Sequence, residues 1–533
     1  MSLPLSALTK LLLTDPDKFM QELKKNPDHL SFEIAEELDQ HDPLGYTYKM
    51  FEIDEKLIPF AGHSLGPLFN PVRQEINRTL DLQQKLHAGH FPDSHPKGKQ
   101  SGHWFDCDRE KESLNGAKQL LGFKEEHEFC FMPSGLSHNF GTVVETFFSP
   151  TKKDWQSGKS KILTLEGEFF SDQAVVASVL EREIQSAKNH ECFNGTKKEP
   201  TPESEIIKIE AADKKNGLYR TEDIIKAIKD NADTIQMICL SDIVFNTGQR
   251  LELDKIFEAV GDIIKKNNIK VILDLAHTVG NRPVNLESMP ITAAVGCAYK
   301  HLSGPAGSSL GIYVNRNVDL KNYPPIRGWK GADPNQVFQK INSYDASIME
   351  KKAGATAFRT SNPPPLALHP AQVFLSEFGK IGFDKCFNKS ECLTRYLIMQ
   401  LQHHLGDKII EIITPLDPKQ RGATIAVRVK NNVDVRVIEE KLKEAGFEID
   451  SRPPNILRMT AHYGYTKFTH INRFVTSLKK VLNKNLEHDE ALHKKWGVVA
   501  LATGLVTAFS LFAVSRWISG SSAPVASPKF TPK

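Results

Sequence analysis

Four side chains with reactive groups lie between residues 274 and 300 of the sequence. They are a carboxylate, an imidazole, a phenol and a primary amine, from Asp274, His277, Tyr299 and Lys300. A lysine amine can bond to the aldehyde carbon of pyridoxal 5′-phosphate (PLP), and a carboxylate can pair with the protonated pyridine nitrogen of this cofactor. The pattern predicts a PLP site in which Lys300 holds the cofactor and Asp274 keeps its ring protonated.

Short apolar runs must position these four residues. Val271–Leu273 ends at Asp274, and Ala293–Val295 leads into Tyr299 and Lys300. Ligands of open α/β sheets bind beyond the carboxyl ends of the strands. Two neighbouring strands would therefore deliver all four groups to one cleft.

Apolar periodicity outlines the elements around this cleft. The order of strand, helix and strand over 235–240, 254–267 and 271–273 predicts an α/β fold with a mainly parallel sheet and right-handed crossovers. Further along the chain, strands alternate with helices and predict a smaller α+β domain, with elements at 424–430, 435–445, 455–459 and 469–482.

The composition is that of an ordinary folded protein, with 40% hydrophobic and 25% charged residues. The formal charge of +3 is close to balance, so we expect no nucleic-acid partner. Seven cysteines are scattered without a CxxC pair, and their odd number indicates reduced thiols in the cytosol. The N-terminus lacks the basic and long apolar regions of a signal peptide.

A charge-free apolar run, Gly497–Val514, lies near the C-terminus. A helix from Trp496 to Trp517 would be roughly 30 Å long, about one hydrocarbon thickness. Tryptophans at both edges, with Lys495 and Arg516 beside them, are typical of an interfacial anchor. A buried C-terminal helix is the alternative, but such a helix usually has a polar face. We expect a tail anchor that leaves the catalytic body in the cytosol.

With 533 residues, the chain is long enough for two domains with appendages. Three successive prolines at 363–365 indicate a boundary between the domains. We expect a helical arm (1–50), a large PLP-binding domain (51–365), a small α+β domain (366–485), a transmembrane helix (497–517) and a short polar tail (518–533).

Metal-ligating residue types gather in one segment, at His87, His90, His95, His103 and Cys107. Their spacing matches no zinc pattern, and the neighbouring prolines and glycines predict a surface loop. We expect no metal there, and we favour contact of one of these histidines with the substrate.

A phosphate site is predicted by Ser134, Gly135 and Ser137, which precede an expected helix at 140–148. Free backbone N–H groups and the helix dipole at such a position bind phosphate, although simple capping by serine is the alternative. Phe169 follows a predicted strand, where an aromatic ring either stacks on a cofactor or packs in the core.

Taken together, these residues resemble the kynureninase family, PLP-dependent enzymes of the aspartate-aminotransferase fold (fold type I). The resemblance runs from about residue 50 to about residue 480. It rests on short motifs in the family order, namely GHSLG (62–66), GLSHN (135–139), FFSD (169–172), NTGQ (246–249), DLAHTVGN (274–281), AYK (298–300), GW (328–329) and FRTSNPP (358–364).

The resemblance implies a role for each matching residue. Lys300, Tyr299 and His277 would be catalytic, with Lys300 bound covalently to PLP. Arg458 would grip the α-carboxylate of the substrate with its planar guanidinium, and Ser64 would lie near the substrate. Cofactor contacts would come from Lys300, Leu136, Ser137, Phe169, Asp172, Ser241, Asp274, His277, Tyr299, Trp329 and Asn362.

The resemblance also implies an activity. The enzyme would hydrolyse the Cβ–Cγ bond of L-kynurenine or 3-hydroxykynurenine, giving anthranilate or 3-hydroxyanthranilate and L-alanine, in tryptophan catabolism and NAD biosynthesis. It would be a homodimer. The sequence departs from the family at Ser137, Asn246 and His301, where Thr, an aromatic residue and Tyr are usual. The hydrophobic tail is not a usual family feature either.

Two other functions remain open. A cysteine-desulfurase-like enzyme of the same fold would need a mobile nucleophilic cysteine, whereas Cys386 and Cys392 lie in a helical pattern. A membrane-tethered scaffold without activity would have no need for the intact Lys300, Asp274 and Arg458.

Overall fold

The computed structural model describes residues 3–86, 107–193, 199–326, 328–331, 352–361, 364–430 and 434–483. By its internal contacts, the chain divides into two units, Met1–Ser477 and Leu478–Lys533. Both large sheets and the candidate site belong to the first unit. In the second unit, the described residues are 478–483, and they are helical.

A seven-stranded sheet is the centre of the region from 129 to 314. Its strands are β4 (Phe129–Phe131), β5 (Lys161–Leu165), β6 (Ile206–Ile209), β7 (Ile235–Ser241), β8 (Lys270–Asp274), β9 (Ala293–Cys297) and β10 (Ser309–Val314). Their order is β4-β10-β9-β8-β7-β5-β6. Strands β5 to β9 run parallel to their neighbours among themselves, and β10 is antiparallel to β4 and β9. The sheet is mainly parallel, as the sequence predicts.

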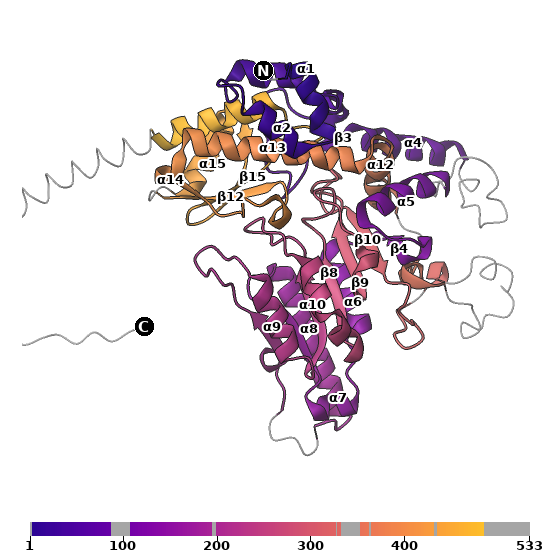
Figure 1. The fold of residues 1–533 in the computed structure, drawn as a ribbon. Coiled ribbons are helices and arrows are strands. Elements are labelled where there is room, and N and C mark those ends of the chain that lie inside the picture. Colours follow the sequence, from indigo (N-terminus) through magenta and orange to yellow (C-terminus); the bar gives the residue numbers. More distant parts are fainter. Residues whose placement is uncertain are drawn as a thin grey trace, which may run out of the picture. The chain divides into compact units, whose positions relative to one another are not determined.

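Helices cover both faces of this sheet. Alternate residues of β7 belong to two different apolar clusters, Met237 and Cys239 to one and Ile238 and Leu240 to the other. A strand buried on both faces reads as a continuous apolar run, which β7 does. The first cluster contains residues of α6 (Leu136–Phe147) and α8 (Phe170–Asn189), and the second contains residues of α9 (Thr221–Asp230) and α10 (Leu253–Lys266) (Figure 1).

The register of the sheet brings reactive side chains to its carboxyl edge. Ser241 at the end of β7 lies opposite Asp274 at the end of β8, and Asp274 lies opposite Val295 of β9. Tyr299 and Lys300 follow directly after β9. The two neighbouring strands therefore place the carboxylate and the lysine at one edge.

A second sheet of four antiparallel strands lies in the C-terminal half of the first unit. Its strands are β11 (Ile410–Ile412), β12 (Thr424–Val429), β14 (Asp450–Arg452) and β15 (Ile456–Thr460), in the order β11-β12-β15-β14. Helices α13 (Phe383–His404) and α15 (Val435–Glu444) lie next to it (Figure 1). In this sheet, Asp450 lies directly opposite Arg458.

The N-terminal residues form short helices, namely α1 (Leu5–Leu8), η1 (Thr9–Leu13), α2 (Pro16–Leu23), α3 (Phe32–Gln40) and η2 (Gly45–Met50). Asp15 caps α2 by accepting a hydrogen bond from the Lys18 amide at 2.9 Å. Figure 1 shows this segment beside α13, and a buried ion pair at 2.6 Å joins Asp42 to Lys389 of that helix.

The remaining elements connect the two sheets. β2 (Ile58–Pro59) pairs in parallel with β13 (Phe447–Glu448), so the chain just before the GHSLG motif is joined to the C-terminal half. The other helices and strands are β1 (Phe51–Glu52), β3 (Leu68–Phe69), α4 (Asn70–Leu86), α5 (Cys107–Leu121), η4 (Glu126–Glu128), α7 (Lys152–Ser157), η5 (Glu203–Glu205), η6 (Leu286–Ser288), η7 (Trp329–Gly331), η9 (Gly354–Phe358), α12 (Pro365–Ile381), α14 (Gly406–Ile409) and η10 (Pro418–Gln420).

Most expected elements are present, with small shifts of their ends. The strand expected just before Phe169 is β5, and the helix expected at 254–267 is α10. The polar and charged residues at 185–204 predict an exposed loop. This prediction is wrong for the first part of the segment, because α8 continues to Asn189. Ile184 and Ala187 are buried on that helix, so the many charged residues there form its solvent face.

In the part of the chain that the structure describes, no helix is long and apolar enough to cross a membrane. The expected transmembrane helix at 497–517 and the polar tail at 518–533 lie outside the described residues.

Candidate functional site

A cavity of about 310 Å³ lies at the carboxyl edge of the large sheet. Eight residues expected in a PLP site line it, namely Leu136, Ser137, Phe169, Ser241, Asp274, His277, Tyr299 and Lys300. Gly135, His138, Ile243, Phe245, Ala276 and Gly307 complete the lining. The structure therefore brings together residues that are spread over more than half of the sequence expected to form the large domain.

Lys300 and His277 are in direct contact inside this cavity. The lysine Nζ lies 2.9 Å from the Nε2 atom of His277. Burial and the charge of Lys300 hold the pKa of His277 well below its ordinary value, so the imidazole is neutral. An ammonium group donates and cannot accept, so Nε2 is the acceptor and the ring proton is on Nδ1.

Three buried carboxyl groups, from Glu168, Asp172 and Asp274, lie close together at the site, and Asp274 is the one that lines the cavity. Asp274 accepts a hydrogen bond from the Ala276 amide at 2.7 Å, and Glu168 accepts one from the Ser241 hydroxyl at 2.5 Å. Neither carboxyl oxygen of Asp172 has a hydrogen-bond donor among the described residues. Burial, together with the charge of Asp274, raises the pKa of Asp172. Burial also raises the pKa values of Asp274 and Glu168, and at Asp274 the charge of Lys300 opposes this effect.

The amino end of α6 forms another wall of the cavity. Gly135 is the N-cap residue and provides no side-chain cap, so the first amides of the helix have no partner within it. The Ser137 hydroxyl lies 2.7 Å from that of Ser171, which ties the helix start to the FFSD segment. Such a helix end, open to a cavity, favours an anion.

The two aromatic residues of the site have different surroundings. The ring of Phe169 packs edge-on against that of Phe245, with centroids 5.3 Å apart, and both rings line the cavity. The Tyr299 ring lies 5.8 Å from the Lys300 Nζ. Burial, with Cys297 and Asp274 nearby, raises the pKa of the Tyr299 phenol, so it carries its proton at neutral pH.

Arg458 lies behind the Phe245 wall of the cavity and is 1% exposed. Its Nε donates to Asp450 at 2.6 Å, its Nη2 pairs with the same carboxylate, and its Nη1 donates to the Phe245 carbonyl. These partners use three of the five guanidinium N–H groups, which leaves one on each terminal nitrogen. Two parallel N–H groups of this kind suit a carboxylate.

Of the predicted residues whose side chains the structure describes, Asp172, Arg458 and Ser64 do not line the cavity. Ser64 lies on the loop of the GHSLG motif, where the neighbouring Gly66 amide donates to the Tyr299 carbonyl at 2.9 Å. Trp329 begins η7, but its side chain is outside the description. Asn362 and the histidines of the 87–107 segment also lie outside the described residues. Among the residues that are described, no group of His, Cys, Asp and Glu is arranged to hold a metal ion.

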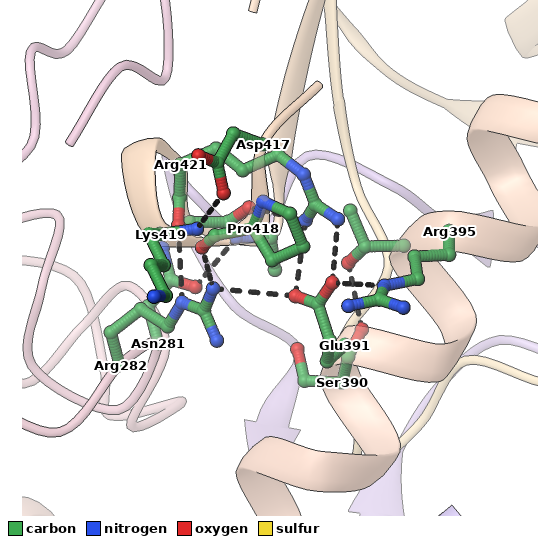
Figure 2. A network of polar contacts seen from close by, with 12 residues as sticks. Asn281, Arg282, Ser390, Glu391, Arg395, Asp417, Pro418, Lys419 and Arg421 are labelled. Carbon is green, nitrogen blue, oxygen red and sulfur yellow. Dashed lines mark hydrogen bonds and ion pairs between the residues drawn. The ribbon is translucent and has the colours of Figure 1, made fainter. Parts of the chain in front are cut away.

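The loop that carries His277 is held by a polar network from the C-terminal half (Figure 2). Asn281 donates to the His277 carbonyl at 2.9 Å and accepts from the Ala423 amide at 2.8 Å. The next residue, Arg282, pairs with Glu391 of α13 at 3.3 Å. Figure 2 shows Glu391 between Arg282 and Arg421, whose guanidinium lies 2.6 Å from the same carboxylate. The small sheet and α13 thus position the loop of His277.

These surroundings fit PLP. Lys300 supplies the amine for the PLP aldehyde, and the open amino end of α6 suits the phosphate. Asp274 and Asp172 are the acidic groups for a pyridinium nitrogen, and the carboxyl oxygens of Asp172 have no hydrogen-bond partner among the described residues. Burial disfavours the charged forms of these carboxyl groups, and a cationic ring nitrogen beside them would favour those forms.

The sequence left three contributors unassigned. Glu168 follows β5 at the carboxyl edge, so the strand-end rule that identified Asp274 could also have identified it. Asp450 lies opposite Arg458 in a hairpin, but β14 was not among the expected strands. His63 contacts Asp450 at 3.4 Å, a pairing that no local pattern could reveal.

Comparisons with known proteins agree with this geometry. The family model described as "Kynureninase C-terminal domain" matches residues 387–478. A kynureninase of Dictyostelium discoideum is 28% identical over 87% of this chain and 99% of its own length. A kynureninase of Myxococcus xanthus is 29% identical over 84% of this chain and 96% of its own length.

Solved structures show the fold. The apo structure of a cysteine desulfurase from Thermococcus onnurineus NA1 has a TM-score of 0.61 and 14% identity, over 82% of this chain and 98% of that chain. The cystine C–S lyase C-DES has a TM-score of 0.58 and 14% identity, over 80% of this chain and 98% of that chain. The α/β fold predicted from the sequence is confirmed by these two structures.

Proposed function

We propose that this protein is a PLP-dependent kynureninase. It hydrolyses the Cβ–Cγ bond of L-kynurenine, 3-hydroxykynurenine or both, and releases L-alanine with anthranilate or 3-hydroxyanthranilate. The observation that carries this proposal is the cavity that unites Lys300, His277 and Asp274, with Arg458 behind one wall. The kynureninases that match 84% and 87% of the chain support both the activity and the cofactor.

Each predicted site residue has a role in the proposal. Lys300 would bind PLP covalently, and Asp274 and Asp172 would pair with its ring nitrogen. Phe169 would contact the ring, and Arg458 and Ser64 would bind the substrate. The other cofactor contacts are Leu136, Ser137, Ser241, His277, Tyr299, Trp329 and Asn362.

Bound PLP supplies an electron sink that stabilises negative charge on the substrate carbons next to its amino group. The two remaining N–H groups of Arg458 bind the α-carboxylate and orient the substrate. The substrate amine would take the place of Lys300 on the cofactor, so the freed Lys300 amine would remove the Cα proton, and His277 would accept a hydrogen bond from the resulting ammonium group. Water would then add to the γ-carbonyl, and the Cβ–Cγ bond would break with the new carboxyl group leaving on the aromatic product. The protonated Tyr299 phenol would donate its proton to Cβ, and Lys300 would return its proton to Cα to give alanine.

A cysteine-desulfurase-like reaction is the runner-up, because solved desulfurases share the fold. That reaction needs an accessible thiolate on a mobile segment. Cys386 and Cys392 are each 0% exposed inside α13, and burial raises the pKa of Cys386 to about 12. The six cysteines whose side chains are described are all buried. Kynurenine hydrolysis is therefore the better assignment.

The proposal includes the assembly and the location of the enzyme. Leu65 and Phe170, which neighbour the predicted site residues Ser64 and Phe169, are 46% and 73% exposed. A homodimer that covers these apolar side chains next to the site fits this exposure. The apolar run Gly497–Val514 anchors the tail in a membrane, and the catalytic part lies in the cytosol.

One experiment tests the proposed activity and cofactor. The purified holoenzyme should show the absorbance of a lysine-bound cofactor and release alanine from L-kynurenine, but no sulfur from cysteine. Lys300→Ala should lose both that absorbance and alanine release. Persistence of a covalently bound cofactor in Lys300→Ala, or sulfur release in place of alanine release, would refute the proposal.

A further inference from the structure

The loop of the GHSLG motif lies between the two halves of the site. At its start, the Phe60 carbonyl accepts a hydrogen bond from the Thr460 amide of β15 at 2.8 Å. At its end, the Gly66 amide donates to the Tyr299 carbonyl at 2.9 Å. One short loop therefore links the lysine segment of the large sheet to the strand that carries Arg458.

His63 lies at the middle of this loop and is 0% exposed. Its Nδ1 lies 2.9 Å from the Thr460 hydroxyl, and its Nε2 lies 3.4 Å from the Asp450 carboxylate. That carboxylate is the group that holds the Arg458 Nε at 2.6 Å. An unbroken series of contacts thus leads from the loop through His63 and Asp450 to the guanidinium.

The protonation states give these contacts a direction. Burial alone would raise the pKa of Asp450, but the hydrogen bond from His63 and the charge of Arg458 hold it down to about 2. Asp450 is therefore an ionised acceptor, so the Nε2 of His63 must carry the proton and donate it. The Nδ1 of the neutral ring then accepts from the Thr460 hydroxyl, which in turn accepts from the Thr424 hydroxyl at 2.9 Å. One tautomer of His63 satisfies every partner.

Besides Arg458, the Asp450 carboxylate has two partners at 3.4 Å, namely the buried His63 ring and the Nε of Arg452, whose side chain is 47% exposed. The buried ring is the more rigid of the two, so it can hold the carboxylate in one orientation toward Arg458. Asp450 has a half-buried side chain, 17% exposed, so solvent does not replace a lost donor fully. Without the His63 donor, Asp450 could rotate and carry the guanidinium away from the cavity wall. His63 does not line the cavity itself, so it acts through its neighbours.

We propose that His63 is a positioning residue for substrate binding, which aligns the Arg458 guanidinium through Asp450. This inference rests on the proposed function, because it assigns Arg458 to the α-carboxylate of the substrate. His63 contributes equally to substrate and transition-state binding, since the α-carboxylate does not change during the reaction. Its loss therefore raises KM and leaves kcat in place.

Two substitutions separate the two contacts of the ring. A glutamine amide reaches the position of Nε2 and can still donate to Asp450, whereas an asparagine amide reaches that of Nδ1 and keeps the Thr460 contact. In the holoenzyme, His63→Asn should raise KM for L-kynurenine about tenfold with kcat within about twofold, as expected for a hydrogen bond to a charged group. His63→Gln should keep both constants within about twofold of the wild type.

The buried His462 provides a matched control. It is 1% exposed, and its hydrogen bonds are made with the His301 carbonyl and the Gly464 amide. His462→Gln should leave KM unchanged. An amine analogue that lacks the α-carboxylate should inhibit wild type and His63→Asn equally.

A double-variant cycle tests whether His63 acts through Asp450. Asp450→Asn alone should raise KM, and adding His63→Asn to it should raise KM no further, because both changes act on Arg458 through one contact. Independent, multiplying increases would overturn the inference, as would equal KM values for His63→Asn, His63→Gln and wild type. A wild-type enzyme that releases no alanine from kynurenine would instead refute the proposed function.

Discussion

The Nζ of Lys300 and the Nε2 of His277 are 2.9 Å apart, although the two residues follow different strands. Both loops begin at the carboxyl edge, where β8 and β9 lie side by side. A neutral imidazole in this place provides an acceptor for the lysine proton without adding a second positive charge. The contact makes His277 the partner of the group that must release and recover protons during the reaction.

Replacing His277 should therefore affect catalysis more than cofactor loading. His277→Phe keeps a ring but removes the acceptor, and we expect kcat to fall roughly a hundredfold, the lower end for loss of a proton-transfer partner. His277→Gln, whose amide oxygen can reach the place of Nε2, should retain most of kcat. Steady-state alanine release measures both variants, and the cofactor absorbance should be the same in each. Equal losses in the two variants would show that the acceptor at Nε2 is not what matters.

Among the described residues, no donor forms a hydrogen bond to the Asp172 carboxyl group. We therefore expect its replacement to have opposite effects on the stability of the apo protein and on PLP binding. In the apo protein, burial and Asp274 disfavour its charged form, and an amide at this position could donate to Asp274. Asp172→Asn should therefore stabilise the apo protein by about 1 kcal/mol and weaken PLP binding about tenfold. Thermal melting of apo and holo forms, with a PLP titration, checks both signs. An apo variant that melts below apo wild type would contradict the account of Asp172.

The close approach at Gly66 predicts an effect on the position of the lysine. A Cβ at Gly66 would lie 2.4 Å from the Lys300 carbonyl and 2.6 Å from the Ser303 hydroxyl, so the lysine segment would have to move. Gly66→Ala should lower kcat roughly a hundredfold, because small displacements of reacting groups are costly.

Gly141 in α6 is the matched control, since its Cβ would meet Val175 at an ordinary 3.7 Å. Gly141→Ala should keep full activity and stabilise the protein by up to about 1 kcal/mol through helix propensity. Full activity in Gly66→Ala would show that the loop of the GHSLG motif can shift to make room for the added Cβ while Lys300 keeps its position.

Because His462 is buried, we expect the stability of the folded protein to fall in acid. Burial lowers its pKa to about 3 in the folded protein, while the unfolded chain keeps the ordinary value of about 6.5. Between these values the unfolded state binds the extra proton, so stability rises with pH and falls on acidification. His462→Gln removes this group, and should lose about 2 kcal/mol less stability than wild type between about pH 7.5 and about pH 5. Urea unfolding at both pH values measures the difference. Equal losses in variant and wild type would contradict it.

The sequence predicts best what depends on local patterns. β7 begins where the strand expected at 235–240 begins, and the strand-end rule placed Asp274 and Lys300 at one edge. The partners of His63 depend instead on how β14 pairs with β15, and on the return of the chain from residue 63 to 450. Pairings between such distant segments are set by tertiary packing, and the local periodicity of apolar residues carries no information about them. The domain boundaries, the dimer and the membrane anchor stay predictions.

The site also depends on the order in which the chain is made. His63 is separated from Asp450 by 387 residues, and Arg282 reaches the 418–421 segment from more than a hundred residues away. A ribosome releases residue 63 long before residue 450 exists, so the arginine pocket cannot form during most of translation. Nascent chains would therefore present the lysine edge of the large sheet before any substrate can be held there, and amino-acid recognition would begin when β15 has joined its sheet.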